Sequence, residues 1–140
     1  MNTFRTETKV TATLEEAWTF LGDAKALTGM TVFPKVKTIG DTRTIAGNTI
    51  QLKVGLPPIF VEWESLIPIV GQHAFVDVGV NVPFPFVAWC HLHRVEQRPD
   101  GVYMIDELLY KSYFPKMIVD LLILKPMFDQ RKRAILDYFS

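Results

Sequence analysis

The chain contains a single cysteine among its 140 residues, and other features that mark particular protein classes are equally scarce. With Cys90 alone, no internal disulfide can form and no cluster of cysteines can hold a structural metal. Lys plus Arg and Asp plus Glu both number 15, so the positive excess typical of proteins that bind nucleic acid or anionic membranes is missing. We therefore expect no nucleic-acid partner.

Long uninterrupted apolar segments are missing as well. The longest apolar run, residues 117–124, contains Asp120 and ends at Lys125-Pro126, well short of the ~20 residues that a membrane span needs. The first 13 residues alternate charged and uncharged side chains and show no targeting pattern. We expect no integral membrane association and a soluble protein located in the cytoplasm.

What the chain does have is an ordinary globular composition. Hydrophobic residues make up 49% and charged residues 21%, which is close to the average for folded domains. A chain of this length is long enough to bury one sizeable core. Neither an internal repeat nor a linker is evident, so residues 1–140 are predicted to form a single domain.

The first 30 residues predict one strand followed by two short helices. Residues 3–10 alternate apolar and polar side chains, which is typical of a strand with one solvated face. Thr13 and Glu16 have the spacing of a capping box, and the helix that they open should stop near Gly22. A second short helix is predicted over residues 24–30.

The middle of the chain predicts consecutive strands with period-2 alternation. Pro34 lies within the first of them, which suits an edge or a strand start. These predicted strands cover residues 32–39, 48–54, 59–67 and 73–80.

Residues 86–110 predict a β-hairpin around the turn Arg98-Pro99-Asp100-Gly101. A four-residue loop places His93 opposite Asp106, whereas a three-residue loop with a bulge would place Arg94 there. We prefer the first register because it gathers polar, titratable and aromatic side chains on one face, namely Trp89, His91, His93, Asp106 and Tyr110.

The last segment, residues 115–139, predicts a long helix. Pro126 lies within it and cannot donate its amide, so we expect a kink or break near residues 122–126. The order of the predicted elements indicates an α+β fold: about seven antiparallel strands and two short helices, with the sheet curled around the C-terminal helix.

Several short motifs add a family resemblance that extends over essentially the whole chain. In order, they are Phe75-Val-Asp77, the Pro83–Phe86 bend, Trp89-x-His91-x-His93, Gly101…Asp106…Tyr110 and Phe128-x-x-Arg131. This order resembles the START/SRPBCC superfamily, also called Bet v 1-like or helix-grip proteins, and in particular its bacterial cyclase/dehydrase-like or cell-division-inhibitor-like members. The chain departs from their pattern in Asn81-Val-Pro-Phe-Pro85, which lacks a glycine before the proline, and at Val95, where phenylalanine is common.

The resemblance implies a helix-grip fold with a deep, largely apolar cavity between the sheet and the C-terminal helix. Such cavities hold a lipid, a polyketide or another hydrophobic molecule, and some members catalyse cyclisation or dehydration. We expect a cavity of roughly 300–1,000 Å³, with residues 115–124 as part of its wall. The predicted ligand-binding residues are Trp63, Trp89, His91, His93, Asp106, Tyr110, Met117 and Leu121.

Two interpretations of the pair His93 and Asp106 stay open. The pair is either an acid/base group, in which the carboxylate orients the imidazole, or a buried polar pair that fixes the hairpin register. His91, His93 and Asp106 also have ligand-type side chains, but three residues make a weak metal signal. We expect no metal and no other cofactor.

Three functions follow from these patterns. The first is non-catalytic binding of a hydrophobic small molecule; the second is a cyclase or dehydratase-like enzyme that uses His93 and Asp106; the third is a protein-interaction module. An apolar row on the outer face of the hairpin, at Ala88, Cys90, Leu92, Ile105 and Leu109, also predicts a homodimer.

Overall fold

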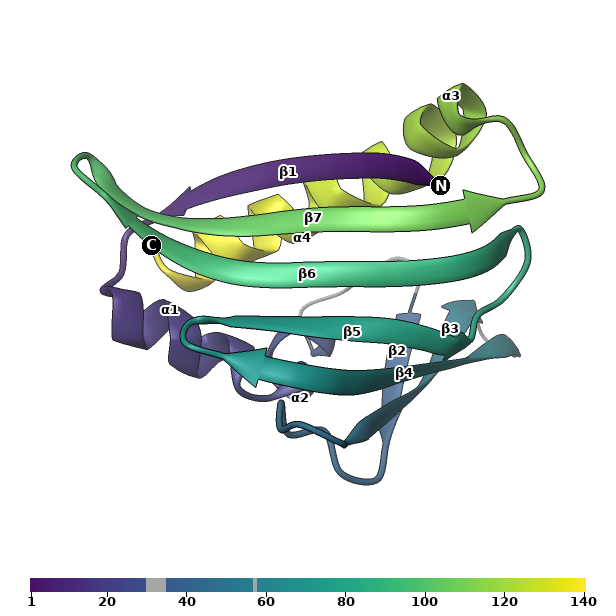
Figure 1. Ribbon diagram of the computed structural model, residues 1–140, viewed down its shortest axis with the longest axis horizontal. Coiled ribbons are helices and arrows are strands. Elements are labelled where there is room, and N and C mark those ends of the chain that lie inside the picture. Colours follow the sequence, from purple (N-terminus) through teal and green to yellow (C-terminus); the bar gives the residue numbers. More distant parts are fainter. Residues whose placement is uncertain (30–34, 57) are drawn as a thin grey trace.

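The structure, a computed structural model, describes residues 1–29, 35–56 and 58–140. Seven antiparallel strands form one curled sheet in the order β1-β7-β6-β5-β4-β3-β2 (Figure 1). The first strand pairs with the last one, so the chain returns to the edge of the β6–β7 hairpin. The strands are β1 (Asn2–Val10), β2 (Lys35–Ile39), β3 (Thr49–Leu56), β4 (Ile59–Gly71), β5 (Ala74–Asn81), β6 (Phe86–Arg98) and β7 (Gly101–Ser112).

Helices α1 (Leu14–Leu21) and α2 (Ala24–Thr28) lie at one end of the sheet, and the C-terminal helix runs along its inner side (Figure 1). The predicted capping box is present: the Glu16 amide donates to Thr13 Oγ1 at 3.1 Å. Helix α1 ends at Gly22 and α2 is followed by Gly29. Residue 30 and residues 32–34, which were predicted to belong to a helix and a strand, lie outside the described residues.

The predicted hairpin register is confirmed. Arg98 pairs with Gly101 at the turn, and His93 lies opposite Asp106. The adjacent β5 places Asp77 opposite His91. Because side chains alternate across a strand, the inward faces of β5, β6 and β7 bring these titratable groups to one place.

The C-terminal helix is widened at the predicted position, but it is not broken. It comprises α3 (Lys116–Val119), a π-helical turn over Asp120–Leu124 and α4 (Lys125–Tyr138). Pro126 cannot donate an amide to the preceding turn. The Lys125 amide instead donates to the carbonyl of Asp120, five residues back, so the helix absorbs the proline as a π-bulge.

Two apolar clusters pack between the sheet and the helices. The first packs α1 against β3–β7 around Phe20, Ile67 and Met104. The second packs the C-terminal helix against Trp89 and Tyr110. None of the helices in the described ranges is long and apolar enough to cross a membrane.

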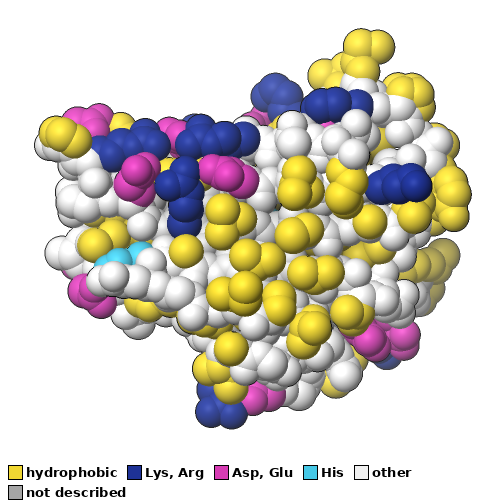
Figure 2. Space-filling model, in the orientation of Figure 1, with side chains coloured by type: hydrophobic (Ala, Val, Ile, Leu, Met, Phe, Trp, Pro, Cys, Tyr) yellow, Lys and Arg dark blue, Asp and Glu magenta, His cyan; other side chains and the backbone are white. Residues whose placement is uncertain are grey.

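The outer face of the sheet divides into two areas (Figure 2). Ion pairs cover one end, where β1, β6 and β7 carry Arg5, Glu7, Arg94, Arg98 and Glu107. Apolar side chains cover the central area of the same face. The sheet therefore presents charge on both faces, because the inner face carries the cluster described next.

Candidate functional site

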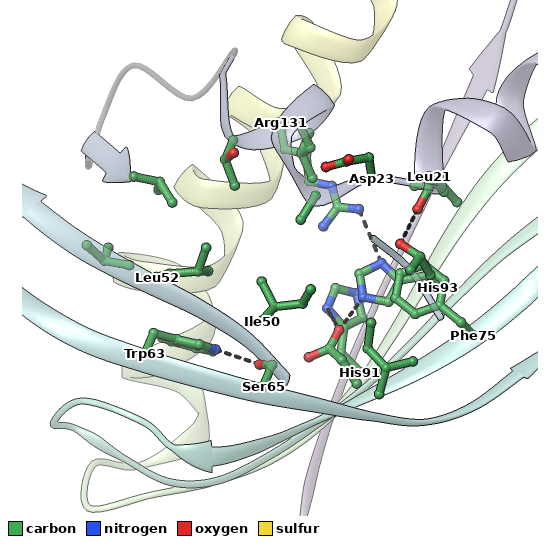
Figure 3. A pocket seen from close by; sticks show the side chains of 18 of the residues that line it. Leu21, Asp23, Ile50, Leu52, Trp63, Ser65, Phe75, His91, His93 and Arg131 are labelled. Atoms are coloured by element: carbon green, nitrogen blue, oxygen red, sulfur yellow. Dashed lines mark hydrogen bonds and ion pairs between the residues drawn. The ribbon is translucent and has the colours of Figure 1, made fainter. Parts of the chain in front are cut away.

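A pocket of about 250 Å³ lies between the sheet and α4, with residues of α1 and α2 completing its wall. This volume is slightly below the range of roughly 300–1,000 Å³ usual for ligand sites. Most of the pocket wall is apolar, and its histidines and charged side chains gather toward one end (Figure 3). The apolar wall includes Leu27, Ile50, Leu52, Val54, Trp63, Trp89, Met127 and Phe128.

Two histidines and two aspartates form the centre of the polar end. His91 Nε2 donates to Asp106 Oδ1 at 2.8 Å, and His93 Nε2 donates to Asp77 Oδ2 at 2.5 Å. The two imidazole rings stack, with centroids 3.6 Å apart and planes inclined by 28°. Each imidazole of β6 thus has its own carboxylate: β7 supplies that of His91, and β5 supplies that of His93.

Arg131 on α4 covers this cluster from the helix side (Figure 3). Its Nη2 lies 3.1 Å from Asp106 Oδ1 and 3.4 Å from His93 Nδ1. A guanidinium can only donate, so His93 Nδ1 accepts while Nε2 carries the proton toward Asp77. The contacts therefore select a single neutral tautomer of His93.

The pKa values follow from burial and from these partners. Burial lowers the pKa of His93 to about 4; His91 and Arg131 act in the same direction, whereas Asp77 opposes them. Burial raises the pKa of Asp106, but Arg131 and His91 outweigh it and hold this carboxyl well below its usual range. Burial likewise raises the pKa of Asp77, but the hydrogen bond and charge of His93, together with His91 and Ser65, outweigh it and lower this pKa.

Asp77, His91 and His93 together offer three ligand-type atoms within 4.8 Å of one another. A metal bound by an imidazole lies close to the ring plane, along the nitrogen lone pair. Nε2 of His91 and both nitrogens of His93 already have hydrogen-bond partners, so a metal bound there would have to displace these contacts. The guanidinium of Arg131 beside His93 also opposes a second cation. The arrangement fits a hydrogen-bonded network better than a metal site.

Four of the predicted ligand-binding residues line the pocket: Trp63, Trp89, His91 and His93. Asp106 lies behind them and holds His91 and Arg131 in position. The predicted hydrogen bond between His93 and Asp106 is wrong, because their nearest polar atoms are 3.6 Å apart. Although the two residues are opposite in register, the His93 ring turns toward Asp77 on the other neighbouring strand.

Three further residues that were predicted to bind the ligand, Met117, Leu121 and Tyr110, do not line the pocket. Met117 and Leu121 are 76% and 60% exposed, so residues 115–124 do not supply the predicted wall. The C-terminal helix contributes to the pocket wall through α4 instead, beyond the π-helical turn, with Met127, Phe128 and Arg131. Tyr110 is fully buried in the second apolar cluster, where its hydroxyl donates to Asp120 Oδ1 at 2.5 Å.

The sequence predicted no binding role for Asp77 and Arg131, two residues of the polar end, although both belong to the motifs that carry the family resemblance. Asp77 and Phe75 lie on the inward face of β5, and the Phe75 ring stacks on the His93 ring with centroids 4.2 Å apart. The alternation of β5 was visible in the sequence, but nothing local showed which of its faces points inward. Arg131 lies three residues after Phe128, a helical spacing that places both on one face of α4.

Comparisons with known proteins identify the fold. No family model and no curated protein matches this chain. Among solved structures, major latex-like protein 151 from Panax ginseng superposes with a TM-score of 0.74 at 8% identity, covering 99% of this chain and 97% of that one. For Ara h 8.0201 the TM-score is 0.73 at 11% identity, with coverage of 99% and 97%.

A protein from Thermobifida fusca gives a TM-score of 0.76 at 17% identity, covering 99% of this chain and 93% of that chain. Sequence identities this low establish the fold alone. The predicted α+β helix-grip fold of the Bet v 1-like type is confirmed.

Proposed function

We propose that this protein binds a small hydrophobic molecule in the pocket between the sheet and α4. The observation that carries the proposal is the lining: an apolar wall with its histidines and charged side chains concentrated at one end. Ligand sites commonly combine apolar walls with a few polar groups that fix orientation. The Bet v 1-like fold supports the proposal because it places a helix across the open side of a curled sheet.

The apolar end supplies most of the binding free energy. Burial of apolar surface contributes about 25 cal/mol per Å², and the aromatic wall is already arranged for it. The Trp63 and Trp89 rings meet edge to face with centroids 4.7 Å apart. The Trp63 indole donates to Ser65 Oγ at 2.8 Å, so the ring presents apolar surface without leaving an unpaired donor.

Binding of the neutral fluorescent probe 1-N-phenylnaphthylamine tests the proposal. Leu52 lines the pocket, and Leu52→Trp should weaken probe binding about tenfold or more by filling the space. Leu109→Trp, on the outer face of β7, is the matched control and should leave binding unchanged. Equal binding by wild type and Leu52→Trp would contradict the proposal. Native mass spectrometry of protein purified from cells would identify a retained ligand.

A second candidate is a cyclase or dehydratase-like enzyme, favoured by the hydrogen bond between His91 and Asp106. The sequence had assigned the acid/base role to His93 with Asp106. In the structure both nitrogens of His93 already have partners, so His91 is the better candidate for proton transfer. The enzyme hypothesis predicts that His91→Gln retains probe binding but changes the mass of the ligand recovered from cells, from product to substrate.

The homodimer predicted from the outer face of the hairpin stays a proposal. Cys90 lies between Val78 and Leu109 in neighbouring strands, and Leu92 lies beside Val76. Strand alternation puts these side chains on the outer face of the sheet. Figure 2 shows that the central area of this face is apolar, and contiguous apolar surface commonly marks an interface. Leu92→Lys should shift a dimer toward monomer in sedimentation velocity without changing probe binding. A wild-type monomer at high concentration would contradict the proposal.

A further inference from the structure

One hydrogen-bond donor of Arg131, its Nε–H, has no acceptor among the described residues around it. The guanidinium engages Asp106 and His93 through Nη2. Its Nε–H is buried and has no hydrogen-bond partner among the described residues. Leaving a donor buried and unpaired costs about 1–3 kcal/mol, and buried donors in folded proteins are nearly always satisfied. An unpaired donor on a residue that lines the pocket therefore indicates an acceptor atom on the ligand.

The charges around Arg131 restrict the chemistry of that acceptor. Asp106 lies 3.1 Å from the guanidinium and already compensates its charge. Asp77 lines the same end of the pocket. When both imidazoles are neutral, these two carboxylates and one guanidinium leave an excess negative charge. An anionic head group would be repelled there, and an ammonium group would offer no acceptor.

We propose that the polar end of the pocket receives the carbonyl oxygen of a neutral, largely apolar molecule, with Arg131 Nε–H as its donor. The inference rests on the proposed binding function and adds the class of ligand. A ketone, ester or lactone oxygen accepts a hydrogen bond without adding charge. The rest of the molecule extends along Leu52, Trp63 and Met127. Because surrounding atoms cover Nε, the oxygen reaches it after a small rotation of the Arg131 side chain.

Three nine- or ten-carbon ligands separate the contributions: 2-nonanone, its alkene isostere 2-methyl-1-nonene, and nonanoate. Each is titrated against bound 1-N-phenylnaphthylamine, using wild type, Arg131→Lys and Arg94→Lys. Lysine keeps a cation facing Asp106 but lacks the Nε–H. Arg94 forms its ion pair on the outer face of the sheet, so Arg94→Lys is the matched control.

We expect wild type to bind 2-nonanone more tightly than nonanoate. Arg131→Lys should weaken 2-nonanone about tenfold, the equivalent of one hydrogen bond to a charged donor, and should leave 2-methyl-1-nonene unchanged. A second measurement avoids the variant: the ¹³C resonance of carbonyl-labelled 2-nonanone should move downfield on binding to wild type.

The outcomes distinguish this inference from the function on which it rests. If the probe and all three ligands fail to bind, the proposed function fails. If the ligands bind but nonanoate is preferred, or Arg131→Lys weakens ketone and alkene equally, only the carbonyl inference is overturned. An unshifted ¹³C resonance in the saturated wild-type complex overturns it independently of any effect of the variant on folding.

Discussion

Asp106 and Glu107 are neighbours on β7, yet they lie in opposite environments. Asp106 points inward, is 6% exposed and contacts His91 and Arg131. Glu107 points outward, has a side chain 39% exposed, and pairs with Arg5 and Arg94. Each carboxylate has two charged or titratable partners within 3.5 Å, so the number of close contacts does not separate them. Solvent does.

The difference lies in what happens when a partner is removed. Water screens and replaces an exposed ion pair, so such pairs contribute about 0–1 kcal/mol. A charge buried without its partner has no such replacement, and breaking a buried pair costs about 3–5 kcal/mol. The outer charges therefore act mainly on solubility and surface specificity. The inner charges hold the geometry of the pocket.

Asp106→Asn is expected to give the largest effect. The substitution keeps the shape of the side chain but leaves the buried Arg131 without its counter-ion, so the free energy of unfolding should fall by about 3 kcal/mol or more. Urea denaturation monitored by tryptophan fluorescence measures this change. The matched outer-face variant, Glu107→Gln, is the control. A loss as small as that of the control would show that the inner cluster is well hydrated.

The inner cluster should also make stability depend on pH. The pKa of His93 is about 4 in the folded protein against an ordinary value of 6.5. Between these two pH values the unfolded chain binds more protons, so stability falls as the pH is lowered from 6.5 to 4, by up to about 3 kcal/mol. The low pKa values of Asp77 and Asp106 act in the same direction below that window.

His93→Gln separates this titration from others, because glutamine can donate to Asp77 and accept from Arg131 without titrating. We expect its free energy of unfolding to change much less than that of wild type between pH 6.5 and pH 4.5. Urea titrations at several pH values provide the comparison. An unchanged slope in the variant would assign the pH dependence to other groups.

Gly79 tests how tightly the inner face is packed. A Cβ at this position would lie 2.4 Å from Val82 Cγ1 and 3.0 Å from Trp89 Cβ. Overpacking typically costs about 1–3 kcal/mol, so Gly79→Ala should destabilise the protein by this amount. Gly71→Ala is the control, since its Cβ would meet nothing closer than the Ala74 carbonyl oxygen at 3.8 Å. Thermal unfolding of both variants measures the difference, and equal midpoints would contradict it.

The same contrast explains which parts of the site the sequence could predict. The register of β6 and β7 follows from a short turn and from alternation, which are local properties, and it placed His93 opposite Asp106 correctly. Asp77 acts through β5, and which face of that strand points inward depends on pairing between strands. Residues 117–124 are apolar almost throughout, so their periodicity could not show that Met117 and Leu121 face outward. The position of Arg131 depends on the π-helical turn that precedes it.

Glu107→Gln should give the smallest effect and completes the comparison between the two faces. Its carboxylate lies 3.0 Å from Arg94 Nη2 and 3.4 Å from Arg5 Nε, and these hydrogen bonds lower the pKa of Glu107 below its ordinary value. Because the group is partly exposed, we expect a loss of less than about 1 kcal/mol at low salt. The loss should shrink further in 1 M salt, where the Debye length is about 3 Å. A double-mutant cycle with Arg94→Ala measures the pair directly. A coupling free energy above about 2 kcal/mol, unchanged by salt, would mean that the outer face is shielded from water, as burial in a dimer would make it.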